Sequence, residues 1–396
     1  MIRTFLCLVL ATLAFSLHAA QTEYIFLVTA DGLRHQEVFT GVDPAILNGG
    51  KTNSGIERLE PLRKKYWADS PKERREKLMP FLWTELLKEG VLYGNRELGS
   101  EVIVRNPHHF SYPGYAEILN GGPVSQIDSN DSNFSPRETV LEFLRRKYNL
   151  KQTEVAAFGS WEVFNWITMH TENAIYCNAG HEAIEPTSLS QRRGRGDESF
   201  FPSIALGKIN ESAQAATFKP SKEMQRWSAL QFEMLSPWDS VRHDAVTLNL
   251  ALEYLAQEKP KIMYLALGET DDWAHDRRYD RYADYANYFD FALRRLWTTL
   301  QSSRKYRGKS TLIVTTDHGR GRTPRDWTSH GKDVPGANEA WLAIFGPDIQ
   351  KIGEAKSAPQ QSLSNIAATI LQLLQINPHE YDRNISSPVA AVLNPK

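Results

Sequence analysis

Short apolar runs alternate with longer amphipathic segments along most of the chain. The first run, residues 24–30, is apolar or β-branched at nearly every position, which is typical of a parallel strand buried on both faces. Similar runs predict four more strands, at 154–161, 261–272, 310–319 and 339–349. We therefore expect a sheet that has little contact with solvent on either face.

Three segments between these runs have apolar residues at helical spacing. They are 242–257, 281–300 and 363–376, and the last has Ser364 near its start as a candidate cap. Strands that alternate with helices predict an α/β fold around a mostly parallel sheet. Residues 50–95 are instead charged, aromatic and helical in pattern, and we expect them to form a helical insertion beside that sheet.

Residues 1–20 have the pattern of a secretory signal peptide, because an arginine precedes an apolar run that ends in small residues. We expect cleavage after Ala20, which leaves a single domain over 21–396 in the periplasm or outside the cell. A membrane anchor is the alternative, although the run is short for a span. Cleavage also removes Cys7, so the mature chain would have no internal disulfide, and we expect its remaining Cys177 to be a packed thiol.

The overall charge narrows the possible partners. Lysine and arginine total 46 and the acidic residues total 47, which gives a formal net charge of −1. Nucleic-acid-binding proteins usually carry a basic excess, so no nucleic-acid partner is expected. No segment after the leader is apolar enough to cross a bilayer. We expect a small-molecule ligand, and the sequence does not indicate an oligomeric state.

Acidic and histidine side chains follow three of the predicted strands. Ligands of such sheets bind beyond the carboxyl ends of the strands, so these side chains are expected at one edge. Each alone has an ordinary structural explanation, such as a helix cap or a buried histidine. Three carboxylates and three imidazoles together suit two zinc-class ions, each with three protein ligands and an open position. The six candidates are Asp31, Asp271, His275, Asp317, His318 and His330.

Metal binding also answers an electrostatic problem. Three carboxylates at one edge would repel one another and have raised pKa values, whereas two dications offset their charge and attract an anion. We expect two divalent ions, zinc with manganese as the alternative, since the donor set suits both. The alternative is a secreted binding protein that has no enzyme activity and is stabilised by the same metals.

The order and spacing of these six residues resemble the two-metal core of the alkaline phosphatase superfamily. This group includes nucleotide pyrophosphatases/phosphodiesterases, sulfatases and cofactor-independent phosphoglycerate mutases. The stretches "DGLRHQEVFTG", "KLMPFLWTELLKEGVLYGN" and "FSYPGYAEILNGG" are similar to a narrower group of secreted bacterial alkaline-phosphatase-like proteins. The resemblance implies a three-layer α/β/α sandwich around a mostly parallel sheet.

The resemblance also implies how the ligands divide. One ion would be held by Asp271, His275 and His330, and the other by the remaining three candidates. Asp272 could replace Asp271, but the family spacing from acid to histidine is four, which favours Asp271.

The family further requires a hydroxyl nucleophile at the start of a helix, where backbone amides favour a bound anion. The segment "HHFSYPGYAEILNGG" (108–122) fits, and it places Ser111 before Tyr-Pro-Gly. Metal coordination would lower the hydroxyl pKa and activate Ser111. The alternatives are that Ser111 only caps the helix, or that Tyr112 is the nucleophile.

Four further residues have two possible roles each. Asn120 and Asn130 could donate hydrogen bonds to a phosphoryl oxygen or simply pack in loops. Arg320 and Arg322 could hold a charged leaving group. They could equally be solvated surface arginines.

The resemblance implies a secreted hydrolase that cleaves phosphate esters through a metal-activated serine and a covalent phospho-serine. A phosphodiester or a sulfate ester on the same site is the first alternative, and a phosphoglycerate mutase-like phosphotransferase is the second. Sulfatases of the family carry a C/S-x-P-x-R pattern for formylglycine, whereas Tyr115 stands where that arginine belongs. This difference argues against a formylglycine sulfatase.

Overall fold

The computed structural model describes residues 21–48, 59–184, 218–234 and 236–389. The predicted leader lies outside these residues. Among them, no helix combines the length and the hydropathy needed to span a membrane.

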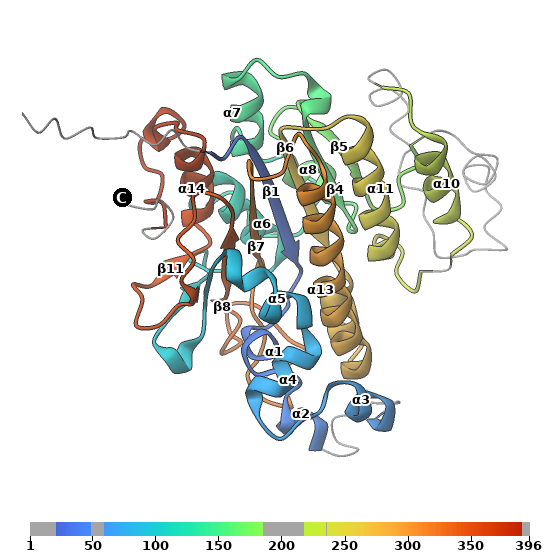
Figure 1. The fold of residues 1–396 in the computed structure, drawn as a ribbon, viewed down its shortest axis with the longest axis vertical. Coiled ribbons are helices and arrows are strands. Elements are labelled where there is room, and N and C mark those ends of the chain that lie inside the picture. The colour runs from blue at the N-terminus through green and yellow to red at the C-terminus, as the bar shows by residue number, and fades with distance from the viewer. Residues whose placement is uncertain (1–20, 49–58, 185–217, 235, 390–396) are drawn as a thin grey trace, which may run out of the picture.

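A sheet of eight strands forms the centre of the molecule, in the order β10-β2-β9-β7-β1-β6-β4-β5 (Figure 1). Strand β9 runs antiparallel to both of its neighbours, and the other strand pairs are parallel. The predicted α/β fold around a mostly parallel sheet is therefore confirmed. The strands are β1 (Tyr24–Ala30), β2 (Gly90–Tyr93), β4 (Val155–Gly159), β5 (Tyr176–Ala179), β6 (Ile262–Leu267), β7 (Ser310–Thr315), β9 (Leu342–Phe345) and β10 (Gly353–Glu354).

A second, smaller sheet pairs three two-residue strands in the order β11-β3-β8. They are β3 (Val102–Ile103), β8 (Glu339–Ala340) and β11 (Gln361–Ser362). The apolar run predicted as one strand at 339–349 is thus divided between two sheets. An apolar run has no direction, so the sequence could not show that β9 is antiparallel.

Helices cover both faces of the large sheet, which gives the predicted three layers. Along β1, Phe26 and Val28 face one buried apolar cluster and Ile25 and Leu27 face the other, because successive side chains of a strand point to opposite faces. The first cluster packs against α1 (His35–Thr40), α2 (Pro44–Asn48), α3 (Leu59–Tyr66), α4 (Pro71–Leu78), α5 (Pro80–Thr84), α10 (Lys222–Leu230), α11 (Asp244–Gln257), α12 (Glu269–His275) and α13 (Tyr279–Ser302). The second packs against α6 (Ser111–Asn120), α7 (Val140–Lys147), α8 (Phe164–Ile167) and α14 (Asn365–Leu373).

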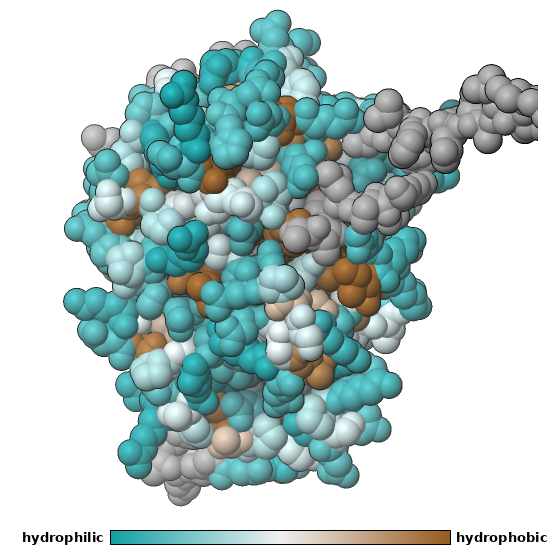
Figure 2. All heavy atoms as spheres, turned by 90° about the vertical axis from the view of Figure 1, so that its left-hand side faces the viewer, coloured by the Kyte–Doolittle hydropathy of each residue, from teal (hydrophilic) through white to brown (hydrophobic). Residues whose placement is uncertain are grey.

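The described part of the predicted insertion contains α3, α4, α5 and the 3-10 turn η2 (Leu86–Glu89). Of these, α3 and α4 lie toward the lower end of Figure 1. Residues near the end of the predicted insertion form β2, whereas the sequence pattern had predicted helix there. Three more 3-10 turns are η3 (Arg96–Leu98), η4 (Gln152–Glu154) and η5 (Pro378–Glu380). The face of the molecule that carries α14 and β11 is mostly hydrophilic, with scattered apolar side chains (Figure 2).

Ser364 is the residue before α14, but its side chain makes no cap hydrogen bond. Its hydroxyl instead donates to Glu117 Oε1 at 2.7 Å. The prediction of a capping side chain is therefore wrong, because the backbone of Ser364 is helical (φ −60°, ψ −21°), whereas a capping residue has extended backbone angles.

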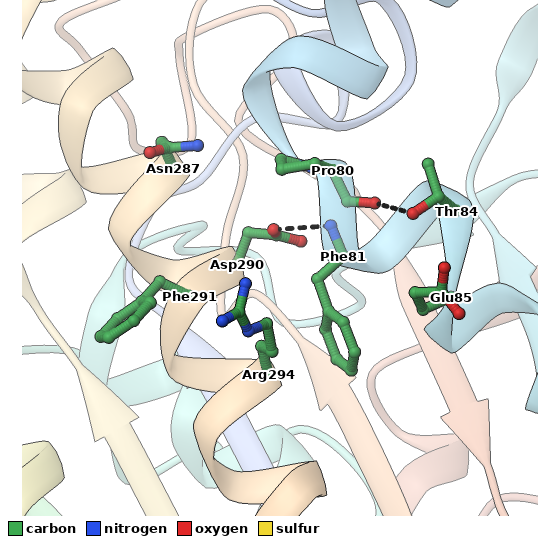
Figure 3. A pocket seen from close by; sticks show the side chains of 8 residues that line it. All are labelled: Pro80, Phe81, Thr84, Glu85, Asn287, Asp290, Phe291 and Arg294. Atoms are coloured by element: carbon green, nitrogen blue, oxygen red, sulfur yellow. Dashed lines mark hydrogen bonds between the residues drawn. The ribbon is translucent and has the colours of Figure 1, made fainter.

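A surface hollow of about 320 Å³ lies between α5 and α13 (Figure 3). Asp290 of α13 accepts hydrogen bonds there from the backbone N–H groups of Phe81 and Leu82, at 2.8 and 2.7 Å. Burial raises the pKa of Asp290 to about 7. This carboxylate fastens the start of α5 to α13, and none of the six candidate metal ligands lines the hollow.

Replacing Asp290 with alanine should lower the free energy of unfolding by about 1–3 kcal/mol, because two backbone donors lose their acceptor. Arg294→Ala in the same hollow is the matched control, since the Arg294 side chain is exposed. Denaturant unfolding of both variants measures the difference. Equal stabilities for the two variants would contradict the role given to Asp290.

Candidate metal centre

Three neighbouring parallel strands bring the candidate ligands to one edge of the sheet. The order β7-β1-β6 places the carboxyl ends of these strands side by side. Asp31 follows β1, Asp271 lies in α12 directly after β6, and Asp317 and His318 follow β7. His330 comes from the loop that leads from β7 toward β8. The sheet therefore assembles residues that are up to about 300 positions apart in the sequence.

His318 lies at the centre of this group. Its Nε2 atom is 3.3 Å from Asp31 Oδ1, 3.5 Å from Asp317 Oδ2 and 3.6 Å from Asp271 Oδ1. The other ring nitrogen, Nδ1, is 2.9 Å from the carbonyl oxygen of Gly319. A hydrogen bond from Nδ1 to that carbonyl fixes the tautomer and leaves Nε2 as a metal donor.

The remaining two imidazoles lie on the α12 side of His318. The ring centroids of His318 and His330 are 4.1 Å apart, and His330 Nε2 is 3.8 Å from Asp271 Oδ1. His275 Nε2 is 3.0 Å from His330 Nε2 and 3.1 Å from Asp271 Oδ2. The structure thus places all six predicted residues in one connected cluster.

The donor atoms form two groups that could each hold an ion. One group is Asp31, Asp317 and His318, as the resemblance implies. The other is Asp271, His318 and His330, so His318 lies within reach of both positions. His275 completes the second group through its contacts with Asp271 and His330. The contacts favour Asp271 over Asp272 as the ligand on α12.

Two buried carboxylate oxygens lack a hydrogen-bond donor, which fits a role as metal ligands. Asp31 Oδ1 and Asp317 Oδ2 are buried and accept no hydrogen bond from the described residues. Burial and the charge of Asp31 raise the pKa of Asp317 well above its usual value. Burial lowers the pKa of His318, but Asp317 and Asp31 outweigh it and raise the value to about 9. Oxygen and imidazole donors with no other partner suit zinc-class ions.

Ser111 is the first residue of α6, and its Oγ atom is 3.4 Å from His318 Nε2. Gly114 makes this approach possible. A Cβ atom on Gly114 would lie 2.3 Å from the carbonyl oxygen of Asp317, so a larger residue would push α6 away from the end of β7. The predicted nucleophile is therefore held against the group formed by Asp31, Asp317 and His318.

The first turn of α6 offers fewer free amides than the sequence suggested. The Tyr112 N–H donates to Asn130 Oδ1 at 3.0 Å, Pro113 has no N–H, and the Gly114 N–H donates to the Phe110 carbonyl. An anion here would depend more on side chains than on the helix start. Because Asn130 accepts with its oxygen, its amide NH2 group is left beside the start of α6.

Asn120 lies at the other end of α6, where its Nδ2 donates to the carbonyl of Ala116. A helix rises about 1.5 Å per residue, so Asn120 is far from Ser111 and packs rather than binds a phosphoryl oxygen.

The two arginines after the predicted strand have different surroundings. Arg320 is buried and pairs with Asp271, and its Nη1 donates to the carbonyl of Thr328 at 2.7 Å. The interpretation of Arg320 as a solvated arginine is therefore wrong, because the loop folds back over it. Arg322 is exposed and pairs with Glu339. Gly32, with φ +56°, leaves room for Arg320, because a Cβ atom there would lie 2.7 Å from its Nε.

Two features of the site have no clear signal in the sequence. Tyr115 donates its hydroxyl to Asp31 Oδ2 at 2.9 Å. The loop before Ser111 is anchored by Glu117, which accepts from the backbone N–H groups of Arg105 and Asn106. A glutamate inside an amphipathic helix usually faces solvent, so its burial could not be read from the pattern. Cys177 is buried in β5, as expected of a packed thiol.

Comparison with known proteins agrees with this geometry. Residues 240–378 match the family model described as Metalloenzyme superfamily, and this segment contains five of the six candidate ligands. The resemblance to the alkaline phosphatase superfamily is confirmed. A search of curated proteins found no match.

Solved structures of this superfamily share the fold at low sequence identity. Wild-type alkaline phosphatase PafA is 11% identical, with a TM-score of 0.51, and the match covers 94% of this chain and 99% of that chain. BT1596, a 2-O GAG sulfatase, is 12% identical with a TM-score of 0.51 over 90% of this chain and 71% of that chain. Phosphonate monoester hydrolase of Agrobacterium radiobacter is 13% identical with a TM-score of 0.50 over 89% and 74%. These likenesses confirm an alkaline phosphatase-like fold.

Zinc should raise the thermal stability of the metal-free protein, because ions that bind only the folded state shift the equilibrium by about 2.7 kcal/mol at a hundredfold excess over Kd. Asp317→Asn should lose most of this gain while making the metal-free protein more stable, since it removes one of the crowded carboxylates. Melting curves with and without zinc measure both effects.

Asp333→Asn is the control, because Asp333 is an exposed carboxylate in the loop that carries His330. It should keep the full response to zinc. A response that is unchanged in Asp317→Asn would contradict the metal assignment.

Proposed function

We propose that this protein is a two-metal hydrolase of phosphate esters in which Ser111 is the nucleophile. The observation that carries the proposal is the position of the Ser111 hydroxyl, 3.4 Å from His318 Nε2 at the centre of the two candidate metal groups. At this position the hydroxyl lies close enough to a candidate metal ligand for the same ion to coordinate both. A serine that only capped α6 would not need this position.

The metals, which we propose to be zinc from the donor types, would lower the pKa of the Ser111 hydroxyl and neutralise charge on the ester. The chain itself supplies the geometry. The Gly114 contact with Asp317 holds Ser111 in place, and Asn130 is positioned to donate its amide N–H to a phosphoryl oxygen. Ser111 attacks phosphorus, the alcohol leaves, and water then releases phosphate from the phospho-serine.

Two observations support a phosphate ester over a sulfate ester. Tyr115 replaces the arginine of the formylglycine pattern, and the hydroxyl of Tyr115 is committed to Asp31. The remaining cysteine, Cys177, is buried in the sheet, which does not suit a formylglycine precursor. A leader peptide on the first twenty residues, which we also propose, would place the reaction in the periplasm or outside the cell.

Ser111→Ala should reduce kcat by at least about a thousandfold toward p-nitrophenyl phosphate, since transition-state contacts of this kind contribute several kcal/mol. Its metal content should not change, because the six candidate ligands are intact. Tyr112→Phe is the matched control: it keeps the ring and loses only a hydroxyl that donates to the Asn133 carbonyl. Initial rates and metal analysis of the three proteins give the comparison.

Assays of a phosphate monoester, a phosphodiester and a sulfate ester with the zinc-loaded protein separate the substrate classes. The proposal requires a phosphate ester to be the best substrate. Faster hydrolysis of the sulfate ester, or full activity of Ser111→Ala, would overturn it.

A further inference from the structure

We infer that His109 is a substrate-binding residue of this site, which donates a hydrogen bond to the third non-bridging oxygen of a phosphate monoester held at Ser111. This inference rests on the proposed function and narrows it to one class of ester. A monoester carries one more charged oxygen than a diester, so an enzyme that prefers monoesters needs an additional donor at that position.

The backbone of His109 has a left-handed conformation, which is uncommon for a residue with a side chain. Its φ is +53°, in the left-handed region, which costs of order 1–3 kcal/mol for a residue with a side chain. Glycine would adopt this conformation without strain. Backbone strain of this kind concentrates at functional sites, where the surrounding structure enforces it.

A buried hydrogen-bond network between the loop before α6 and α6 itself holds His109 in its left-handed conformation. Asn106 Oδ1 accepts the backbone N–H groups of both His108 and His109, each at 3.1 Å. Asn106 is held in turn by Glu117, which accepts from its backbone N–H at 2.8 Å and from its side-chain Nδ2 at 3.0 Å. The helix that begins with Ser111 therefore also fixes the turn that presents His109, so the two residues have a constant separation.

The imidazole of His109 is half-buried. His109 is two positions before Ser111, whose hydroxyl contacts His318. Burial, then the charges of His318 and His108, lower the pKa of His109. Within the described chain, no hydrogen bond or ion pair engages the His109 ring. A neutral imidazole has one N–H donor, and here that donor is free for a ligand.

The arginines of the neighbouring loop cannot serve as this donor. Arg320 is buried and committed to Asp271 and the Thr328 carbonyl. Arg322 pairs with Glu339. His109 is the neighbour of Ser111 that combines an available donor with an enforced position.

The test compares His109→Gly with the wild-type enzyme, both loaded with zinc. The glycine variant should lose about a hundredfold in kcat/KM toward p-nitrophenyl phosphate, the effect typical of removing one transition-state donor. Hydrolysis of bis-p-nitrophenyl phosphate should change by less than about threefold, because a diester lacks the third charged oxygen. Metal content should be unchanged, and the melting temperature should be equal or higher, since glycine removes the strain.

Two further variants separate function from structure. His109→Asn keeps an N–H donor and tolerates the left-handed conformation, so it should retain more monoester activity than the glycine variant. His108→Ala, the matched control, changes the adjacent half-buried imidazole and should leave the ratio of monoester to diester activity unaltered. Added imidazole should restore part of the monoester activity of His109→Gly. Equal losses toward both esters, or no loss, would overturn the inference.

Binding measurements keep this result distinct from the proposed reaction. Calorimetry should show that His109→Gly binds inorganic phosphate at least about tenfold more weakly than the wild-type protein. The affinity for dimethyl phosphate should be the same in both proteins. That outcome supports the role of His109 even if the wild-type protein hydrolyses no phosphate ester, in which case the proposed function alone fails. Equal affinity of both proteins for inorganic phosphate would overturn the role of His109.

Discussion

The crowding of acidic groups around one imidazole nitrogen is the constraint on which the site depends. Three carboxylate oxygens lie within 3.6 Å of His318 Nε2, at an edge where burial penalises charge. Such an arrangement opposes folding unless cations balance it. A protonated His318 offsets part of the repulsion, and no arginine or lysine of the described residues forms an ion pair with Asp31 or Asp317. The apolar strands β7, β1 and β6 pack side by side and fix where their ends lie. Their packing therefore holds the carboxylates together in spite of the repulsion.

Close backbone contacts set the geometry of that edge. The Cβ-free face of Gly114 lets α6 approach the Asp317 carbonyl, and Gly32 leaves room for Arg320 beside Asp271. Neither glycine has a side chain that could bind a ligand, yet each allows two groups of the cluster to approach closely. Substitution at either position would move a whole element, which explains why the polar cluster depends on packing as much as on its own charges.

Glu117 connects the second core layer with the site. It lies inside α6, and it accepts hydrogen bonds from the loop at 105–106 and from Ser364 at the start of α14. Burial raises its pKa, and the surrounding N–H donors oppose that effect. One carboxylate therefore holds α6, the loop with His109 and α14 in a single arrangement.

The sequence by itself determined the alternation of strands and helices, the six polar positions after the strands and the serine before Tyr-Pro-Gly. These depend on local properties: apolar periodicity, residue chemistry and chain order. Tertiary structure alone decided that β9 runs antiparallel, that residues 90–93 join the sheet, that Arg320 is buried against Asp271 and that Asn120 lies away from Ser111. Each of these depends on contacts between segments far apart in the chain, and neither periodicity nor composition carries information about which distant segment fills a given space.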